Sequence, residues 1–268
     1  MFYKEEVCTL EQQTGSETGR AVLVTTTFFK PPQDLRFGLA VKTVDAARAC
    51  GYPIVVVDGS PDPQIREILT QHGALVIEQT EAGMGKSRRQ AIGAGIDQYR
   101  DADVIVWLEP EKHTLVGLLG PCIQPVADGT FDLVIPYRKS LESYPPYQAV
   151  SERLANAALA ALTGRPDLDL YIGPRVMSRA VAEQHFLGYD GKYSDQWESI
   201  FIPVLKALKT GERVGSVEVD YVHPPEQTAA ETGDVEMDGK RDRQRTLIVA
   251  NMARAAVEMQ FFPRLVTA

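Results

Sequence analysis

The chain has 268 residues, of which 44% are hydrophobic and 24% charged, a composition typical of a globular protein that buries its own core. Its net charge of −8 argues against a nonspecific nucleic-acid binder, whose phosphate contacts need clustered lysine and arginine. The three cysteines fit neither a disulfide framework nor a zinc site, and no apolar run reaches the roughly 18–20 residues of a membrane span. The first residues lack a signal-peptide pattern, so we expect a cytoplasmic protein.

In the first half of the chain, short apolar runs that predict strands alternate with segments that predict helices. The predicted strands are 21–27, 54–57, 74–77, 104–108 and 131–136. The predicted helices are 36–50, 86–98, 115–126 and one that begins at Pro61 with Ser60 as its cap. This alternation predicts an α/β fold with a mostly parallel central sheet and right-handed crossovers. Residues 1–19 are polar and are expected to form an N-terminal arm.

The second half is richer in predicted helix. The predicted helices are 147–162, 179–186, 194–209 and 226–264, the last with a polar break around 233–239. Two further strands are predicted at 171–177 and 214–219. The sequence shows no repeat and no low-complexity linker, so we expect a single domain with a helical C-terminal part. The apolar positions around 247–259 could pack on the chain's own core or on a second subunit, which would make a homodimer.

The apolar run 104–108 ends abruptly at Glu109-Pro110-Glu111. Open α/β sheets bind ligands at the carboxyl ends of their strands, and this run has the character of an interior strand. Carboxylate oxygens are the ligands that Mg²⁺ and Mn²⁺ prefer, so Glu109 and Glu111 could hold such an ion against a diphosphate. The alternative is a pair of exposed acids in a strand-to-helix loop.

Other polar groups are expected at the same edge of the sheet. Asp58 ends the second strand and could accept hydrogen bonds from a nucleotide, or it could form an ordinary Asp-Gly turn. Three hydroxyl residues end the first strand, either facing a nucleotide or serving only as strand residues: Thr25, Thr26 and Thr27.

The tract from Gly83 to Ser87 places Gly83, Gly85 and Lys86 at the start of a predicted helix, a position suited to an anion. It is not a P-loop, because Thr80 stands where that motif needs its first glycine. A P-loop kinase is therefore disfavoured, and the alternative to anion binding is a flexible turn with a solvated lysine.

The order and spacing of these parts resemble a GT-A glycosyltransferase over residues 20–225, and most resemble enzymes of the mannosylglycerate synthase and glucosyl-3-phosphoglycerate synthase type. The resemblance implies a Rossmann-type fold in which residues 20–140 bind a nucleoside-diphosphate sugar and residues 141–268 bind a small acceptor. The expected activity is metal-dependent transfer of the sugar to an acceptor hydroxyl. It implies that Glu109 and Glu111 occupy the place of the family's paired aspartates, with His223 as a third ligand of Mg²⁺ or Mn²⁺.

The same resemblance implies roles for residues of the second half. Asp195 is the candidate base of an inverting enzyme, with Glu198 second, whereas a retaining enzyme, which the resemblance favours, would need no such base. Trp197 could stack on the sugar, and Arg138 and Arg175 could bind the acceptor, although solvated cations are an alternative for both arginines. His223 alone would be read as a loop residue.

Two other functions remain open. Glutamates replace the family's aspartates, and a non-catalytic nucleotide-sugar-binding protein of the same fold is one rival. A nucleotidyltransferase is another, but such enzymes carry a glycine-rich loop after the first strand, and here residues 25–30 contain no glycine.

Overall fold

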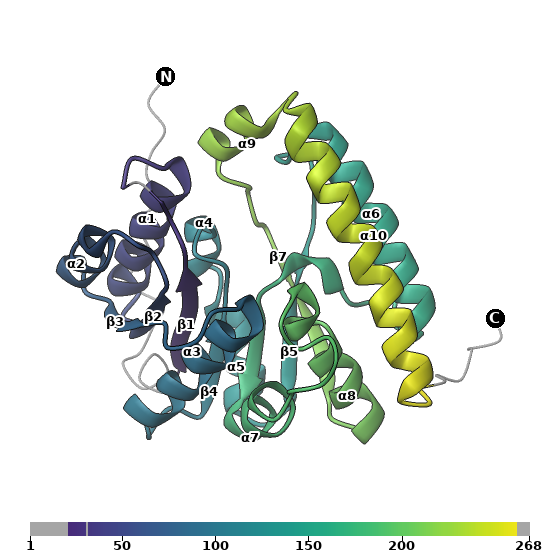
Figure 1. Cartoon of the computed structure of the whole chain (residues 1–268). Helices are drawn as coiled ribbons and strands as arrows, with labels where there is room; N and C mark the ends of the chain where they lie inside the picture. The colour runs from purple at the N-terminus through teal and green to yellow at the C-terminus, as the bar shows by residue number, and fades with distance from the viewer. Residues whose placement is uncertain (1–20, 31, 262–268) are drawn as a thin grey trace.

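A computed structural model describes residues 21–30 and 32–261 of the chain, so the predicted arm 1–19 lies outside the described residues. In the described part, seven strands form one sheet with helices on both faces (Figure 1). The strands are β1 (Ala21–Thr27), β2 (Ile54–Asp58), β3 (Leu75–Glu78), β4 (Val104–Trp107), β5 (Leu133–Arg138), β6 (Arg175–Ser178) and β7 (Val214–Val219).

The strand order is β3-β2-β1-β4-β6-β5-β7, and β6 alone runs antiparallel to its neighbours β4 and β5. The other pairs, β1–β2, β1–β4, β2–β3 and β5–β7, are parallel. The prediction of a mostly parallel sheet is therefore confirmed. The antiparallel course of β6 has a local consequence, because it brings the start of β6 beside the carboxyl end of β4, where Trp107 pairs with Arg175.

Two apolar layers enclose the sheet. One cluster joins the sheet to α1 (Leu35–Ala49), α2 (Pro63–Gln71), α4 (His113–Val116) and α5 (Gly120–Ala127). The other joins the opposite face to α3 (Met84–Gln98), α6 (Pro146–Thr163), α8 (Ile202–Thr210) and α10 (Val235–Glu258). Covering on both faces explains why all four residues of β4 are buried and why its sequence is a continuous apolar run.

Short elements complete the chain. They are the single helical turn α7 (Arg179–Val181), the π-helical η4 (Ala182–Leu187), the 3₁₀ turns η3 (Leu170–Ile172) and η5 (Trp197–Ile200), and α9 (Pro225–Glu231). In the part of the chain that the structure describes, no helix has the length and apolar character needed to cross a membrane.

Several predicted elements are wrong in their boundaries, among them the strand predicted at 171–177, which is β6 at Arg175–Ser178. Helix α2 begins at Pro63 and is capped by Asp62, because the hydroxyl of Ser60 is instead bonded to Asp58. The predicted helix 115–126 is two helices, and the predicted helix 194–209 begins only at Ile202, after the 3₁₀ turn η5. The break in the C-terminal helices covers residues 232–234 rather than 233–239.

The C-terminal helix α10 lies beside α6, and the two form one outer side of the molecule (Figure 1). Helix α9 reaches back to the first half of the chain through two ion pairs with α1. Arg36 Nη2 lies 3.1 Å from Glu231 Oε1, and Lys42 Nζ lies 2.5 Å from Glu226 Oε1. The division into residues 20–140 and 141–268 stays a prediction, since strands of both parts share the one sheet.

Candidate functional site

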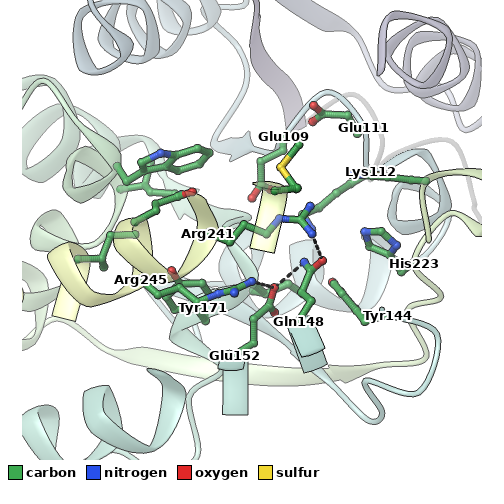
Figure 2. Close-up of a pocket in the computed structure, with 18 of the residues that line it drawn as sticks. Glu109, Glu111, Lys112, Tyr144, Gln148, Glu152, Tyr171, His223, Arg241 and Arg245 are labelled. Atoms are coloured by element: carbon green, nitrogen blue, oxygen red, sulfur yellow. Dashed lines mark hydrogen bonds and ion pairs between the residues drawn. The ribbon is translucent and has the colours of Figure 1, made fainter. Parts of the chain in front are cut away.

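A cavity of about 530 Å³ lies at the carboxyl ends of β4, β5 and β7 (Figure 2). Its walls come from distant parts of the chain: the loop after β4, the start of α6, η3, η5, the segment after β7, and α10. Five of the residues singled out from the sequence line it: Glu109, Glu111, Arg138, Trp197 and His223. The fold therefore brings Glu109 and His223, which are 114 positions apart in the sequence, to the same cavity.

The carboxylate of Glu109 points into this cavity and is only partly satisfied. Its Oε2 atom is buried and has no hydrogen-bond partner. Gly173, just before β6, makes room for it, because a Cβ atom there would overlap the carboxylate, and Gly173 has a φ of 89°. The loop that carries Glu109 is bonded to α1, where Thr43 Oγ1 donates to the Pro110 carbonyl at 2.5 Å. An unpartnered buried carboxylate oxygen fits a divalent cation.

The predicted third metal ligand is not assembled with the two glutamates. Among the described residues, no group of three or more His, Cys, Asp or Glu side chains is arranged to hold a metal ion. His223 is buried, its Nδ1 lies 2.8 Å from Thr228 Oγ1, and its ring lies 4.3 Å from that of Tyr144. Burial and the nearby Lys112 lower the pKa of His223 to about 3, so the imidazole is neutral.

A lysine ammonium lies among the predicted metal ligands. Lys112 Nζ sits 5.1 Å from the centroid of the Tyr221 ring and lines the cavity. Burial opposes the charge, but Tyr144, Tyr221 and Glu109 outweigh it and raise the pKa of Lys112 above its ordinary value. Burial also raises the pKa of Glu111, although Arg36 counteracts it. Because Mg²⁺ is commonly held by one or two carboxylates together with phosphate oxygens, Glu109 and Glu111 fit the ion without His223.

The residues that end β1 and β2 are placed beside the cavity and do not line it. Asp58 is fully buried and accepts hydrogen bonds from Thr27 Oγ1 at 2.7 Å, Ser60 Oγ at 2.5 Å and Arg66 Nη1 at 3.3 Å. Thr25 is buried within the strand and Thr26 is half-buried. These contacts give Asp58 a structural role in the loop after β2, and nucleotide binding by Asp58, Thr25, Thr26 and Thr27 stays a prediction.

The N-terminus of α3 is occupied by the chain's own carboxylate. Asp195 Oδ1 accepts a long hydrogen bond, 3.4 Å, from the backbone N–H of Lys86. Gly83, with a φ of 129°, and Gly85 allow this approach, since Cβ atoms there would overlap Asp195 and the Ser194 carbonyl. Lys86 Nζ pairs with Glu81 at 2.8 Å, which raises the pKa of the lysine. Asp195 does not line the cavity, so its catalytic role stays a prediction.

Three other predicted residues are held by partners within the protein. Arg138 lines the cavity, but its guanidinium bonds Asp169 at 2.6 Å and Glu152 at 2.5 Å, which keep the pKa of this buried arginine above its usual value. Arg175 is fully buried and donates to backbone carbonyls, and Glu198 accepts from Asn251 Nδ2 at 2.6 Å. Neither Arg175 nor Glu198 lines the cavity, so their predicted roles lack support from this placement.

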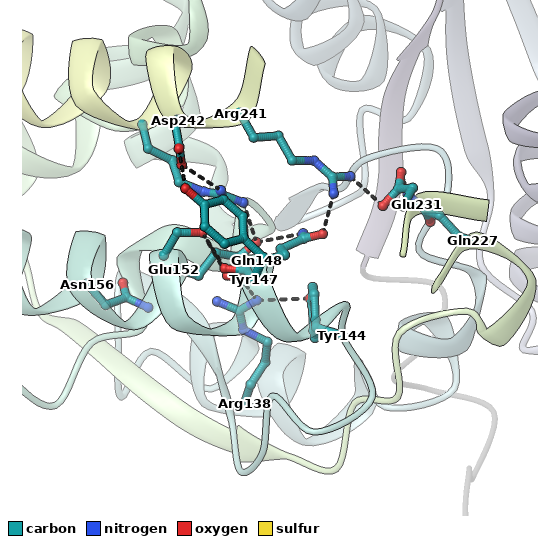
Figure 3. Close-up of polar contacts among 12 residues, drawn as sticks. Arg138, Tyr144, Tyr147, Gln148, Glu152, Asn156, Gln227, Glu231, Arg241 and Asp242 are labelled. Carbon is teal, nitrogen blue, oxygen red and sulfur yellow. Dashed lines mark hydrogen bonds and ion pairs between the residues drawn. The ribbon is translucent and has the colours of Figure 1, made fainter. Parts of the chain in front are cut away.

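The residues that α6 and α10 contribute to the cavity were not predicted from the sequence (Figure 3). Arg241 Nη1 donates to Gln148 Oε1 at 2.5 Å and its other terminal nitrogen pairs with Glu231. Arg245 Nη2 lies 3.6 Å from Glu152 and its Nη1 lies 3.9 Å from Asp242, both ion pairs without a hydrogen bond. Its Nε atom is buried without a hydrogen-bond partner. Each helix contributes two of these residues four positions apart, on one helix face, and that spacing is the signal that could have identified them.

No family model matches the sequence, and no curated protein is significantly similar to it. Solved structures do match the fold, which is a GT-A-like α/β fold. One is glucosyl-3-phosphoglycerate synthase from Mycobacterium tuberculosis in complex with Mn²⁺, UDP-glucose and phosphoglyceric acid. It has a TM-score of 0.62 and 14% identity and covers 89% of this chain and 81% of that chain.

Two other complexes of the same enzyme match similarly. The complex with Mg²⁺ and UDP has a TM-score of 0.60 and 16% identity, and it covers 89% of this chain and 81% of that chain. The complex with Mn²⁺, UDP-glucose and glycerol 3-phosphate has a TM-score of 0.60 and 16% identity, with coverage of 89% and 82%. At these identities the likeness establishes the fold of this chain.

Proposed function

We propose that the protein is a metal-dependent glycosyltransferase that moves a sugar from a nucleoside-diphosphate sugar to a hydroxyl of a small anionic acceptor. The observation that carries this proposal is the cavity at the carboxyl edge of a GT-A-like sheet. Its walls hold a Glu109 carboxylate oxygen and the Arg245 Nε atom, both buried without a hydrogen-bond partner (Figure 2). A carboxylate suits the metal of the donor, and a guanidinium suits an acidic acceptor.

The donor end of the cavity is built on the loop after β4. Glu109 and Glu111 would hold Mg²⁺ or Mn²⁺, the ions present in the glucosyl-3-phosphoglycerate synthase complexes. When bound, the metal offsets charge that develops on the departing diphosphate. Lys112 places a second, fixed positive charge beside Glu109, and such a preorganised cation stabilises a departing diphosphate without reorganising.

The acceptor end is built on α10. Lys240, Arg241 and Arg245 line the cavity from this helix, and Arg245 has donor atoms free for a ligand. The matching complexes hold phosphoglyceric acid or glycerol 3-phosphate, both small anions. A carboxylate or phosphate bonded to Arg245 would fix the acceptor, so that its hydroxyl faces the donor sugar.

Several finer points stay predictions. Retention of configuration rests on the resemblance alone, as do the roles of Asp195 and Glu198. The cytoplasmic location and the homodimer also stay predictions. Light scattering on the purified protein would measure the mass of the particle and show whether the protein is a monomer or a homodimer.

A thermal-shift panel tests the proposed function. The ligands are UDP, GDP, CDP, ADP and TDP, each with and without Mn²⁺, on the wild type, on Glu109→Gln and on the exposed control Glu67→Gln. Ligands that bind the folded state raise the melting temperature by mass action. We expect a Mn²⁺-dependent rise with one diphosphate, kept in Glu67→Gln and lost in Glu109→Gln. No rise with any diphosphate would overturn the proposal, and binding without sugar transfer would leave a non-catalytic binding protein.

A further inference from the structure

Arg88 of α3 is a buried cation that lies between the only two tryptophans of the chain. The guanidinium carbon of Arg88 lies 5.2 Å from the ring centroid of Trp107 and 4.8 Å from that of Trp197, the two tryptophans in the sequence. Trp107 ends β4, two residues before Glu109, whereas Trp197 begins η5 and lines the cavity. The guanidinium therefore contacts both β4, which leads into the loop with Glu109, and η5, which carries Trp197 in the cavity wall.

The hydrogen bonds of Arg88 all go to the segment that carries Trp197. Its Nη1 donates to the carbonyls of Gln196 and Trp197 at 3.3 and 3.4 Å, and to Ser199 Oγ at 2.8 Å. The 3₁₀ turn η5 is only four residues long and has no side-chain cap at its start. Short turns of this kind have little stability of their own. The orientation of the Trp197 ring thus depends on the contacts that Arg88 supplies.

This arrangement keeps a charge buried without a close ion pair. Arg88 is 4% exposed, and no carboxylate among the described residues lies within ion-pair distance of it. Burial lowers the pKa of Arg88 to about 10, with Glu109 and Glu198 opposing the shift. Its Nε atom has no hydrogen-bond partner. Burying a guanidinium without an ion pair is unfavourable unless its hydrogen bonds offset the cost, and here those bonds all go to the Trp197 segment.

We propose that Arg88 is a positioning residue that holds the indole of Trp197 flat in the cavity wall, where the indole forms a stacking surface for the ring of the transferred sugar. The stacking role rests on the proposed function. Arg88 does not line the cavity and so does not touch the substrate itself. It acts through cation–π contacts of one guanidinium with both indoles, that of Trp107 in β4 and that of Trp197 in the cavity wall.

The test uses Trp197 as its own probe. In a Trp107→Phe background, Trp197 is the only tryptophan, and Arg88→Met and Arg88→Lys are added to that background. Arg100→Met, an exposed arginine just beyond the same helix, is the matched control. The measurements on the ligand-free protein are the emission maximum, the acrylamide quenching constant and the fluorescence anisotropy, together with the melting temperature of each variant.

We expect Arg88→Met to shift the Trp197 emission to longer wavelength and to raise its quenching constant roughly twofold, because the stacked cation and its hydrogen bonds are lost. Arg88→Lys keeps a charge over the ring and should restore part of the signal. Arg88→Met should still melt cooperatively, because the loss of its hydrogen bonds to η5 is partly offset by removal of a buried charge. Unchanged emission and quenching in a folded Arg88→Met would overturn the positioning role.

The same variants separate this inference from the proposed function. UDP-glucose with Mn²⁺ is added to each, and we expect it to protect Trp197 from acrylamide in the Trp107→Phe parent and in Arg100→Met, but much less in Arg88→Met. If the ligand-free signals change as expected while UDP-glucose protects Trp197 in no variant, the positioning of Trp197 stands and the stacking role falls with the donor assignment. Equal protection in Arg88→Met and the parent would overturn the stacking role alone.

Discussion

The carboxylate of Glu109 occupies the space that a side chain at Gly173 would fill. This relationship follows from the sheet, because the antiparallel strand β6 starts beside the end of β4, where Trp107 pairs with Arg175. Gly173 therefore sits opposite the acidic loop and leaves room for its carboxylate. Its positive φ of 89° is a conformation that glycine adopts without strain.

Substituting Gly173→Ala should abolish Mn²⁺-dependent nucleotide binding, because the new methyl group forces the Glu109 carboxylate out of place. Gly173 has φ 89° and ψ −53°, a conformation that costs a residue with a side chain roughly 1–3 kcal/mol, so we also expect a lower melting temperature. Thermal shift with the preferred diphosphate measures both effects. The control is Gly38→Ala in α1, where nothing lies within 4 Å of the new Cβ and helix propensity should rise. Normal nucleotide binding by a folded Gly173→Ala would contradict this geometry.

Replacing Arg245 by methionine should weaken acceptor binding and leave donor binding intact. A hydrogen bond to a charged group contributes roughly 1.5–3 kcal/mol, so we expect KM for the acceptor to rise on the order of 10- to 100-fold. Steady-state kinetics at saturating donor measures this change. Arg243→Met, an exposed arginine two positions earlier on α10, serves as the control. A rise in the KM of the donor instead would place Arg245 at the donor.

The stability of the protein should fall in mild acid partly because of His223. Its pKa is lowered to about 3 by burial and Lys112, whereas in the unfolded chain it is near 6.5. Below the unfolded value only the unfolded chain takes up this proton, so the contribution is complete above about pH 6.5 and is lost progressively as pH falls towards 3. Chemical denaturation of the wild type and His223→Gln between pH 7 and 4 measures it. We expect a steeper loss in the wild type, and parallel curves would show that His223 titrates normally.

Asp195→Asn should retain turnover within a few-fold of the wild type. The carboxylate contacts the backbone N–H of Lys86 at the start of α3 and does not line the cavity, and an asparagine oxygen can accept the same bond. Initial-rate measurements at saturating donor and acceptor test this, with Asp195→Ala expected to lower the melting temperature slightly. A loss of turnover of about 100-fold in Asp195→Asn, typical of a missing general base, would instead support the predicted catalytic role.

Local sequence patterns predicted much of the sheet and one end of the site. The strands at Ala21–Thr27 and Val214–Val219 have the predicted boundaries, because continuous or alternating apolar residues identify a strand without tertiary information. The acidic loop at Glu109 was found because it interrupts an apolar run. Its position at the carboxyl edge of the sheet then followed from the α/β alternation.

The remainder of the site depends on contacts that no local pattern contains. Arg241 and Gln148 are 93 residues apart, and either residue alone is read as part of an ordinary helix surface. The start of α8 was misplaced because the segment before it is shaped by Arg88 and Asn251 rather than by its own helix propensity. Likewise, the sequence left open whether Asp58 binds a nucleotide or forms a turn, and its burial with bonds from Thr27 and Ser60 is visible only in the folded chain.

The position of α10 at the end of the described chain sets the order in which the cavity can be completed during synthesis. Strands β1 to β4 and the acidic loop leave the ribosome first, while Arg241 and Arg245 emerge more than a hundred residues later. Until then the acidic loop faces an open sheet edge with no cationic wall opposite it. Because α10 also contributes buried core residues such as Met252, the cavity and one side of the core are completed together, by the last helix that the structure describes.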